Sequence, residues 1–150
     1  DNYPLRASVA LGGLGALEPI EAMYFVKYTD ERKKPLTGKQ RYLLKEPACG
    51  IPTESFWYFT LYGYTPDGRR VLVEIPISRY SVGNRTRDLV YNADGSLDIV
   101  LQHDAPSNEN LRANWLPAPL GTFHISLRTY VPRPELRDGS ALLPVIEAVD

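Results

Sequence analysis

The sequence predicts a mainly β fold, an antiparallel β-sandwich or jelly-roll-like domain with one N-terminal helix and a proline-rich C-terminal strap. Two observations support this fold class. From Ala22 onward the hydrophobic pattern repeats every two residues, and the repeating segments are joined by short turns instead of by helices. The 150 residues are 43% hydrophobic, which is enough for one domain with a core, so we expect residues 1–150 to form a single domain.

The one expected helix lies at the N-terminus. Pro4 suits a first helical position, and Ala7 and Leu11 share a helical face. Glycines within residues 12–15 each cost about 1 kcal/mol relative to alanine, so we expect the helix to lean on a sheet for its stability. Pro19 then ends the helical segment, because the residue before a proline disfavours the α region.

Strands are predicted where alternation coincides with aromatic and β-branched residues. The strongest is 56–64, and the turn at Asp67-Gly68 predicts a hairpin with 71–75. The same turn chemistry at Asp94-Gly95 predicts a second hairpin. That hairpin would join 89–91 to 97–102, and further strands are expected at 22–28, 39–44 and 123–131.

A row of aromatic residues follows the strongest strand. Tyr58, Tyr62 and Tyr64 share one face of it with Phe56 and Thr60. Such a row favours packing inside the sheet core or between two sheets over an exposed platform for sugars.

The C-terminal segment 132–150 contains three prolines and is expected to be an extended strap. Four apolar residues are predicted to hold it against the domain: Leu136, Leu142, Leu143 and Val145.

Composition excludes several classes of partner. Seventeen Lys and Arg balance eighteen Asp and Glu, and the basic residues are scattered, so no nucleic-acid partner is expected. Cys49 is the single cysteine, and we expect it to be a loop residue or a small buried hydrophobic residue. No apolar run is long enough to span a membrane. Because the sequence begins at Asp1 and not at Met, we expect an upstream anchor segment outside this chain.

The search for reactive groups yields no metal site and no cofactor site. The chain has two histidines, His103 and His124, and His103 is adjacent to Asp104 on a predicted strand, so these two side chains point to opposite faces. No Gly-x-Ser-x-Gly elbow of the hydrolase type occurs. No catalytic residue, metal or cofactor is therefore assigned.

The remaining candidates form a polar constellation of candidate ligand-binding residues. They are Arg79, Tyr80, Asn84, Arg85, His103, Asp104, Asn114 and Trp115. In a structural interpretation, Arg79 or Arg85 pairs with Asp104, Asn114 caps a turn and Trp115 fills one end of the sandwich. In a binding interpretation, the guanidiniums and the Trp115 ring line a cleft for a small anion or an amphipathic ligand. A third possibility is acid–base catalysis by His103 or Asp104.

Four segments carry a family resemblance. The stretches Arg79–Thr86 and Asn114–Pro119, with Tyr91–Leu97 and Gln102–Asp104 between them, closely resemble the core of the bacterial domain of unknown function 1214. The resemblance implies a β-sandwich-like domain, found either after a domain of unknown function 1254 in longer proteins or as a short exported protein behind a membrane anchor. This chain looks like the second form. The family offers no agreed catalytic residues, and Ile75 stands here where its pattern more often has Asn.

Two functional classes follow. The first is a non-enzymatic, extracytoplasmic or periplasmic binding or accessory module, membrane-associated through a segment absent from this chain. Its partner would be a membrane or envelope protein, or a small ligand. The alternative is a hydrolase-like small-molecule enzyme that uses Arg79, His103 and Asp104.

Overall fold

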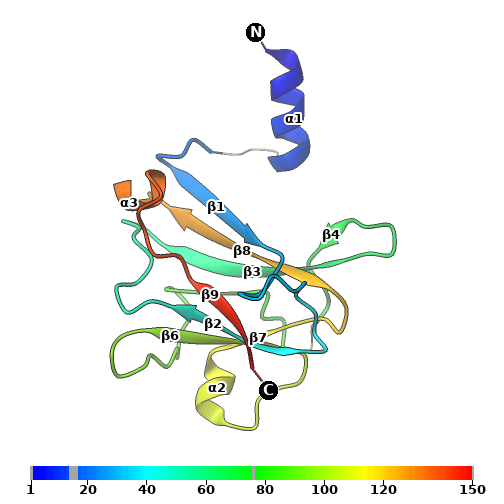
Figure 1. The fold of residues 1–150 in the computed structure, drawn as a ribbon, viewed down its shortest axis with the longest axis vertical. Helices are drawn as coiled ribbons and strands as arrows, with labels where there is room; N and C mark the ends of the chain where they lie inside the picture. Colours follow the sequence, from blue (N-terminus) through cyan, green and yellow to red (C-terminus); the bar gives the residue numbers. More distant parts are fainter. Residues whose placement is uncertain (1, 14–16, 76, 150) are drawn as a thin grey trace.

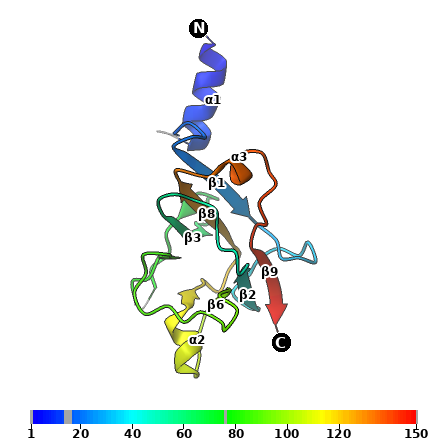
Figure 2. The same ribbon diagram turned by 90° about the vertical axis from the view of Figure 1, so that its left-hand side faces the viewer.

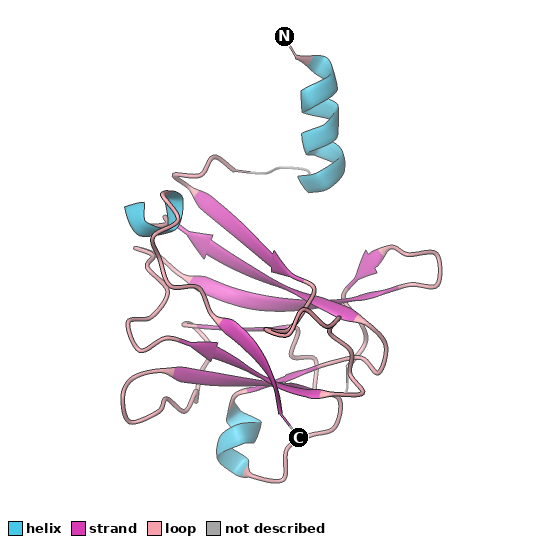
Figure 3. Ribbon diagram, in the orientation of Figure 1, coloured by secondary structure: helices cyan, strands magenta, loops and turns pink. Residues whose placement is uncertain are grey.

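Two β-sheets lie face to face in the computed structural model, which describes residues 2–13, 17–75 and 77–149 (Figure 1). The first sheet has the order β1 (Ala22–Lys27), β8 (Phe123–Tyr130), β3 (Trp57–Tyr64) and β4 (Arg70–Val71), and β5 (Ser81–Gly83) also pairs with β3. The second sheet has the order β7 (Trp115–Pro117), β6 (Leu97–Gln102), β2 (Arg41–Glu46) and β9 (Val145–Val149). The helices are α1 (Tyr3–Gly13), α2 (Glu109–Ala113) and α3 (Pro134–Arg137). Strands prevail in the ribbon of Figure 3, so the fold is mainly β and sandwich-like, as the sequence predicts.

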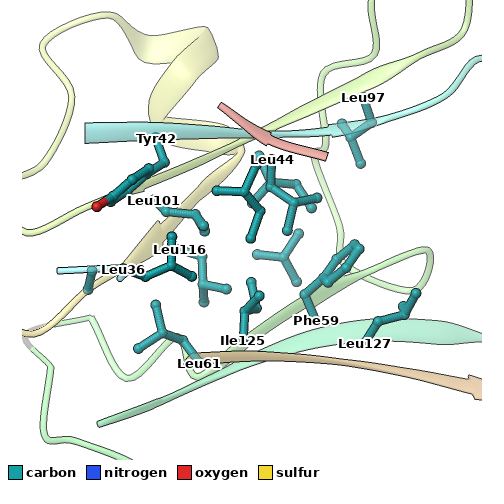
Figure 4. Packing of buried hydrophobic residues seen from close by; sticks show 14 of the residues in the cluster. Leu36, Tyr42, Leu44, Phe59, Leu61, Leu97, Leu101, Leu116, Ile125 and Leu127 are labelled. Atoms are coloured by element: carbon teal, nitrogen blue, oxygen red, sulfur yellow. The ribbon is translucent and has the colours of Figure 1, made fainter. Parts of the chain in front are cut away.

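Two-residue alternation places the core between the sheets. Phe59 and Leu61 of β3 and Ile125 of β8 point toward Leu44 and Leu101 of the second sheet (Figure 4). All five side chains are buried, and each contributes about 1.5–3 kcal/mol through the removal of apolar surface from water. Because successive side chains of a strand alternate, the residues between these core positions lie on the outer face of the first sheet.

The pairing register sets which outward residues become neighbours. In the first sheet, Arg128 of β8 lies between Tyr24 of β1 and Tyr58 of β3. Four residues away on the same face, His124 lies opposite Tyr62. Side chains opposite one another in a ladder are about 5 Å apart, so aromatic residues from three strands meet on one surface.

The predicted second hairpin is only half correct. The turn forms, with Gly95 at φ 87° and its amide donating to Asn92 O. The segment 89–91 is not a strand, however, and β6 pairs instead with β2 and with β7. The side chain of Asn114 bonds both the amide and the carbonyl of Val90, so one buried amide replaces a strand partner. The pairing of β6 with β7 is parallel, which makes the second sheet mixed and not wholly antiparallel.

Helix α1 begins at Tyr3, one residue before the predicted first position at Pro4, and Asn2 Oδ1 accepts from the Leu5 amide at 3.1 Å. The expectation that it leans on a sheet is wrong. Its described side chains from residue 2 to residue 9 are exposed, and the helix stands away from both sheets in two perpendicular views (Figures 1 and 2). Local capping and propensity therefore hold the part of α1 from residue 3 to residue 9, whose side chains are all exposed. No helix in the described ranges is long and apolar enough to cross a membrane.

The C-terminal tail is more structured than a strap. Leu136 is buried as predicted, but Leu142, Leu143 and Val145 are substantially exposed. Short helix α3 was not predicted, and the chain ends in strand β9, which pairs with β2. The free edge of β2 supplies the backbone partners that residues 145–149 need, and this tertiary contact overrides the proline-rich composition.

Candidate functional site

The predicted polar constellation divides into separate groups. Arg79 Nη1 donates to the carbonyl oxygens of Ala113 at 2.8 Å, Trp115 at 3.1 Å and Arg112 at 3.4 Å. These carbonyls lie at and just beyond the end of α2, where a cation complements the negative end of the helix. Trp115 is 4% exposed and donates from Nε1 to Gln102 O at 2.9 Å. Arg79 and Trp115 therefore hold the α2–β7 connection in place.

Asn114 belongs to the same group. It is buried at the C-terminal cap of α2, and its Nδ2 donates to Val90 O and to Asp98 O. Every polar atom of this side chain is thus used within the fold. Such a buried amide fixes a loop and leaves no group to bind a ligand.

A second group lies around β5. The amide of Leu61 donates to Tyr80 O, and the Trp57 amide donates to Asn84 Oδ1 at 3.2 Å, which extends the β3–β5 pairing. Arg85 is exposed, and its guanidinium lies 3.8 Å from the centre of the Phe56 ring. Of the predicted residues, Arg85 is the one whose charge is presented on an open surface beside an aromatic ring.

His103 and Asp104 form the third group, at the end of β6. Both are exposed, and a ring nitrogen of His103 contacts Ala118 O at 2.9 Å. In the described part of the chain, neither Arg79 nor Arg85 makes an ion pair with Asp104. No cluster of three or more metal-ligating side chains occurs within the described ranges.

A different surface gathers most of the described ring–ring and cation–π contacts, and the sequence did not reveal it as a site. It is the outer face of the first sheet, which we call the aromatic face. Its members are Tyr24, Tyr28, Phe56, Tyr58, Tyr62, Tyr64, His124, Arg128 and Tyr130. The strands β1, β3 and β8 that carry it contain no acidic residue.

Arg128 occupies the centre of the aromatic face. Its guanidinium carbon lies 5.4 Å, 5.7 Å and 6.0 Å from the ring centres of Tyr62, Tyr58 and Tyr24. Its Nη2 also donates to the Tyr62 hydroxyl at 2.7 Å. To reach Tyr62 from its own position, the side chain crosses the row of Thr60 and Ser126, which explains why these small polar residues are buried. The cation is thus held over rings, at distances where cation–π attraction is effective.

One end of the aromatic face is a stack of three rings. Phe56 lies 4.4 Å from Tyr130 between ring centres, and the hydroxyls of Tyr58 and Tyr130 are 3.3 Å apart. Burial, and then the hydrogen bond to Tyr130, raise the pKa of Tyr58 to about 12. Beside this stack, Arg85 and Ser81 line an open hollow of about 460 Å³, its open side included.

The other end surrounds a histidine. The rings of Tyr28, Tyr62 and Tyr64 lie 5.3 Å, 5.3 Å and 5.4 Å from the His124 ring, which is 3% exposed. Burial lowers the pKa of His124, and the charges of Arg70 and Arg128 lower it further. Among the described residues the Nδ1 atom has no hydrogen-bond partner. The neutral ring therefore acts as a fourth aromatic surface, and the positive charge at this end comes from Arg70, 5.8 Å from the Tyr28 ring centre.

The outer face of the second sheet has a different chemistry. There Lys45 pairs with Glu147 at 2.6 Å, and Arg41 Nε donates to Gln102 Oε1 at 3.1 Å. The charges of Lys45 and Glu147 thus neutralise each other on that face. By contrast, the described ion pairs do not involve Arg70, Arg85 or Arg128, so the aromatic face is rich in rings and positive in charge.

The sequence contained part of this signal. The tyrosine row of β3 was interpreted as packing within the core, which is wrong because Trp57, Phe59 and Leu61 fill the core from the opposite side. Both faces of β3 are apolar, so its own periodicity cannot say which face is inside. The polar positions of β8, His124 and Arg128, carry the missing information, since they must lie on the outer face.

Comparisons with known proteins agree with the fold and leave the chemistry open. A family model described as "Protein of unknown function (DUF1214)" matches residues 21–134. The chain is similar to the crystal structure of the VPA0106 protein from Vibrio parahaemolyticus, at 26% identity and a TM-score of 0.80 over 97% of this chain. It also shares its fold with an uncharacterised protein from Burkholderia cenocepacia, at 18% identity and a TM-score of 0.52 over 97% of this chain. The chain spans 35% and 39% of those two structures, and no curated protein matches it.

Proposed function

Since the chain belongs to the DUF1214 family, whose function is unknown, we propose that it is a non-enzymatic binding or accessory module that docks onto a partner protein through the aromatic face. As part of this proposal the module acts outside the cytoplasm, on a membrane or envelope protein. The family resemblance supports that location. The enzyme alternative gains nothing from the geometry, because Arg79 is bound to backbone carbonyls and makes no ion pair with Asp104.

The chemistry of the face specifies the partner. Arg85, Arg128 and Arg70 follow the face from one end to the other, and each lies over a ring without a carboxylate among its described ion pairs. Guanidinium groups bind carboxylates in fixed, forked geometry, and tyrosine rings supply apolar contact area at low conformational cost. The proposed partner is therefore an acidic protein segment that also carries apolar side chains.

The dimensions favour a segment over a single side chain. The distance along β3 from Phe56 to Tyr64 is about 27 Å for eight residues of extended chain. A bound segment of similar length would pair its carboxylates with the three arginines and rest its apolar groups on the rings between them. A nucleic-acid backbone is less suitable, because the chain as a whole has a net charge of −1.

The observation that carries the proposal is Arg128 among three tyrosines, because the rings hold the guanidinium in place while no carboxylate in the described ion pairs neutralises it, so its charge is available to a partner. Site-specific photo-cross-linking tests it. A benzophenone amino acid at Tyr24 on the aromatic face should give a discrete adduct in cells, and the linked peptide should be acidic. The matched probe at Tyr91 is also exposed but lies off this face, and it should give none.

Charge reversal sharpens the test. With Arg85→Glu in the same chain, the Tyr24 adduct should fall at least fivefold, and high salt should weaken it as well. Equal adducts from Tyr24 and Tyr91, or an adduct that is indifferent to Arg85→Glu, would overturn the proposed surface. A cross-linked RNA in place of a protein would overturn the proposed partner.

A further inference from the structure

A separate apolar pocket opens at one edge of the sandwich, which we call the edge pocket. It lies between β1, the outermost strand of the first sheet, and β9, the outermost strand of the second. Its floor is the core itself, formed by Leu44, Phe59 and Ile125, and Phe25 of β1 forms one wall. These core residues are seen between the two sheets in Figure 4. The pocket is thus a gap between the edges of the two sheets that reaches down to the core.

One charged side chain enters this apolar space. Lys27 follows Phe25 by two residues on β1, so it points inward, and its Nζ donates to Pro144 O at 3.1 Å. A lysine ammonium carries three donors, so two are left over. In the described part of the chain Lys27 has no ion pair with a carboxylate. Burial, and then the nearby charge of Lys33, lower the pKa of Lys27, which agrees with a partly desolvated ammonium that has no anion beside it.

The third element is a movable wall. Leu143 and Pro144 line the pocket in the segment before β9, and this segment has no strand pairing of its own. The space measures about 300 Å³ with its open mouth, but its interior of about 20 Å³ holds roughly one water molecule. A ligand larger than water would displace Leu143, which is already 37% exposed.

From this geometry we infer that the edge pocket binds a small aliphatic carboxylate, with its carboxylate on Lys27 and its tail between Phe25, Phe59 and Ile146. An apolar cavity with one convergent cation is the pattern of a site for such a ligand. The carboxylate would neutralise the partly buried ammonium, and the tail and the apolar walls of the pocket would shield each other from water. This inference uses none of the residues of the aromatic face and does not rest on the proposed docking function.

Three probes with the same tail test it: octanoate, 1-octanol and octylamine, each below the concentration at which it forms micelles. Calorimetric titration of the wild-type chain should show octanoate binding at least tenfold more tightly than 1-octanol, and no binding of octylamine. Equal binding of all three, or no binding of octanoate, would overturn the inference. These measurements need no variant, so they do not depend on how a mutant folds.

Two variants then locate the site. Lys27→Met keeps an apolar stem of similar length and should abolish the preference for octanoate over 1-octanol, while Leu143→Trp should fill the mouth and weaken both. Lys39→Met removes an exposed lysine elsewhere and should change neither. If Lys27→Met keeps the carboxylate preference, the assignment of Lys27 is wrong. If octanoate fails to bind and Lys27→Met dimerises through β1, Lys27 serves instead as an inward charge that protects the free strand edge, and the inference fails.

Discussion

Single residues in this protein gain their properties from burial more than from sequence neighbours. Glu46 is the clearest case, because strand β2 directs it inward with Tyr42 and Leu44, and it is 4% exposed. Its Oε2 has no hydrogen-bond partner among the described residues, and burial raises the pKa of Glu46 to about 7, against a smaller opposing effect of the Ile51 amide. The predicted strand 39–44 ends two residues before Glu46, so the sequence analysis did not single out this position.

Replacing Glu46 with Gln should therefore change how stability depends on pH. The folded state holds the Glu46 proton more tightly than the unfolded chain, so this group stabilises fully below pH 4.5 and loses that contribution as the pH rises through about 7. At pH 8 the Gln variant should be more stable than wild type, by at most about 3 kcal/mol, and the difference should vanish near pH 4. Urea unfolding at a series of pH values measures it.

Glu135→Gln is the control for that series, since Glu135 is exposed. It should follow the wild-type pH profile. A Glu46→Gln profile parallel to wild type from pH 4 to pH 8 would show that the carboxyl titrates normally and is hydrated.

At the scale of elements, side chains that bond to backbone groups join the loops to the sheets. Arg79 is the example, because one guanidinium nitrogen bonds three carbonyls around the end of α2. In the structural interpretation of the sequence, Arg79 or Arg85 holds the fold together through a carboxylate partner, Asp104, whereas the partners of Arg79 are backbone carbonyls. Sequence shows which side chains are charged, but it does not show which backbone carbonyls the fold leaves without an amide donor.

Two arginines of the same motif should consequently differ in their effect on stability. Arg79→Ala leaves these carbonyls with fewer donors and should cost about 1–2 kcal/mol. Arg85→Ala loses one exposed cation–π contact and should cost less than about 1 kcal/mol. The two free energies of unfolding, compared in denaturant melts, test this difference. Equal and negligible losses would mean that the Arg79 contacts contribute nothing to the fold.

On the scale of the whole molecule, local sequence signals were sufficient to predict an element when its structure depends only on its own residues. The glycine turn before β4 is an example, and it is found as predicted. Local signals were insufficient where pairing with another strand sets the conformation, as for β9, which forms because β2 has an unpaired edge for it. The orientation of β3 was undetermined for a related reason, since either of its apolar faces could have filled the core.

The stability of the two packed sheets should not depend on α1. Ala7→Pro breaks a helix at a local cost of about 3 kcal/mol, but α1 has no buried described side chain, so the global free energy of unfolding should change by less than about 0.5 kcal/mol. Leu127→Ala, in the core, should cost about 3 kcal/mol. The fluorescence of buried Trp57 and Trp115 reports both melts. A loss above about 1 kcal/mol for Ala7→Pro would show that α1 packs against the sheets.

The arginines spaced along the aromatic face also bear on solubility. An exposed surface of tyrosines and a phenylalanine would ordinarily make a protein associate with itself. When two copies meet through this face, however, Arg70, Arg85 and Arg128 of one copy approach the same cations of the other, and like charges brought together at an interface cost several kcal/mol. Charge repulsion therefore opposes self-association through this face, while an acidic segment can still bind to it. The same arginines would then serve both partner recognition and protection from aggregation.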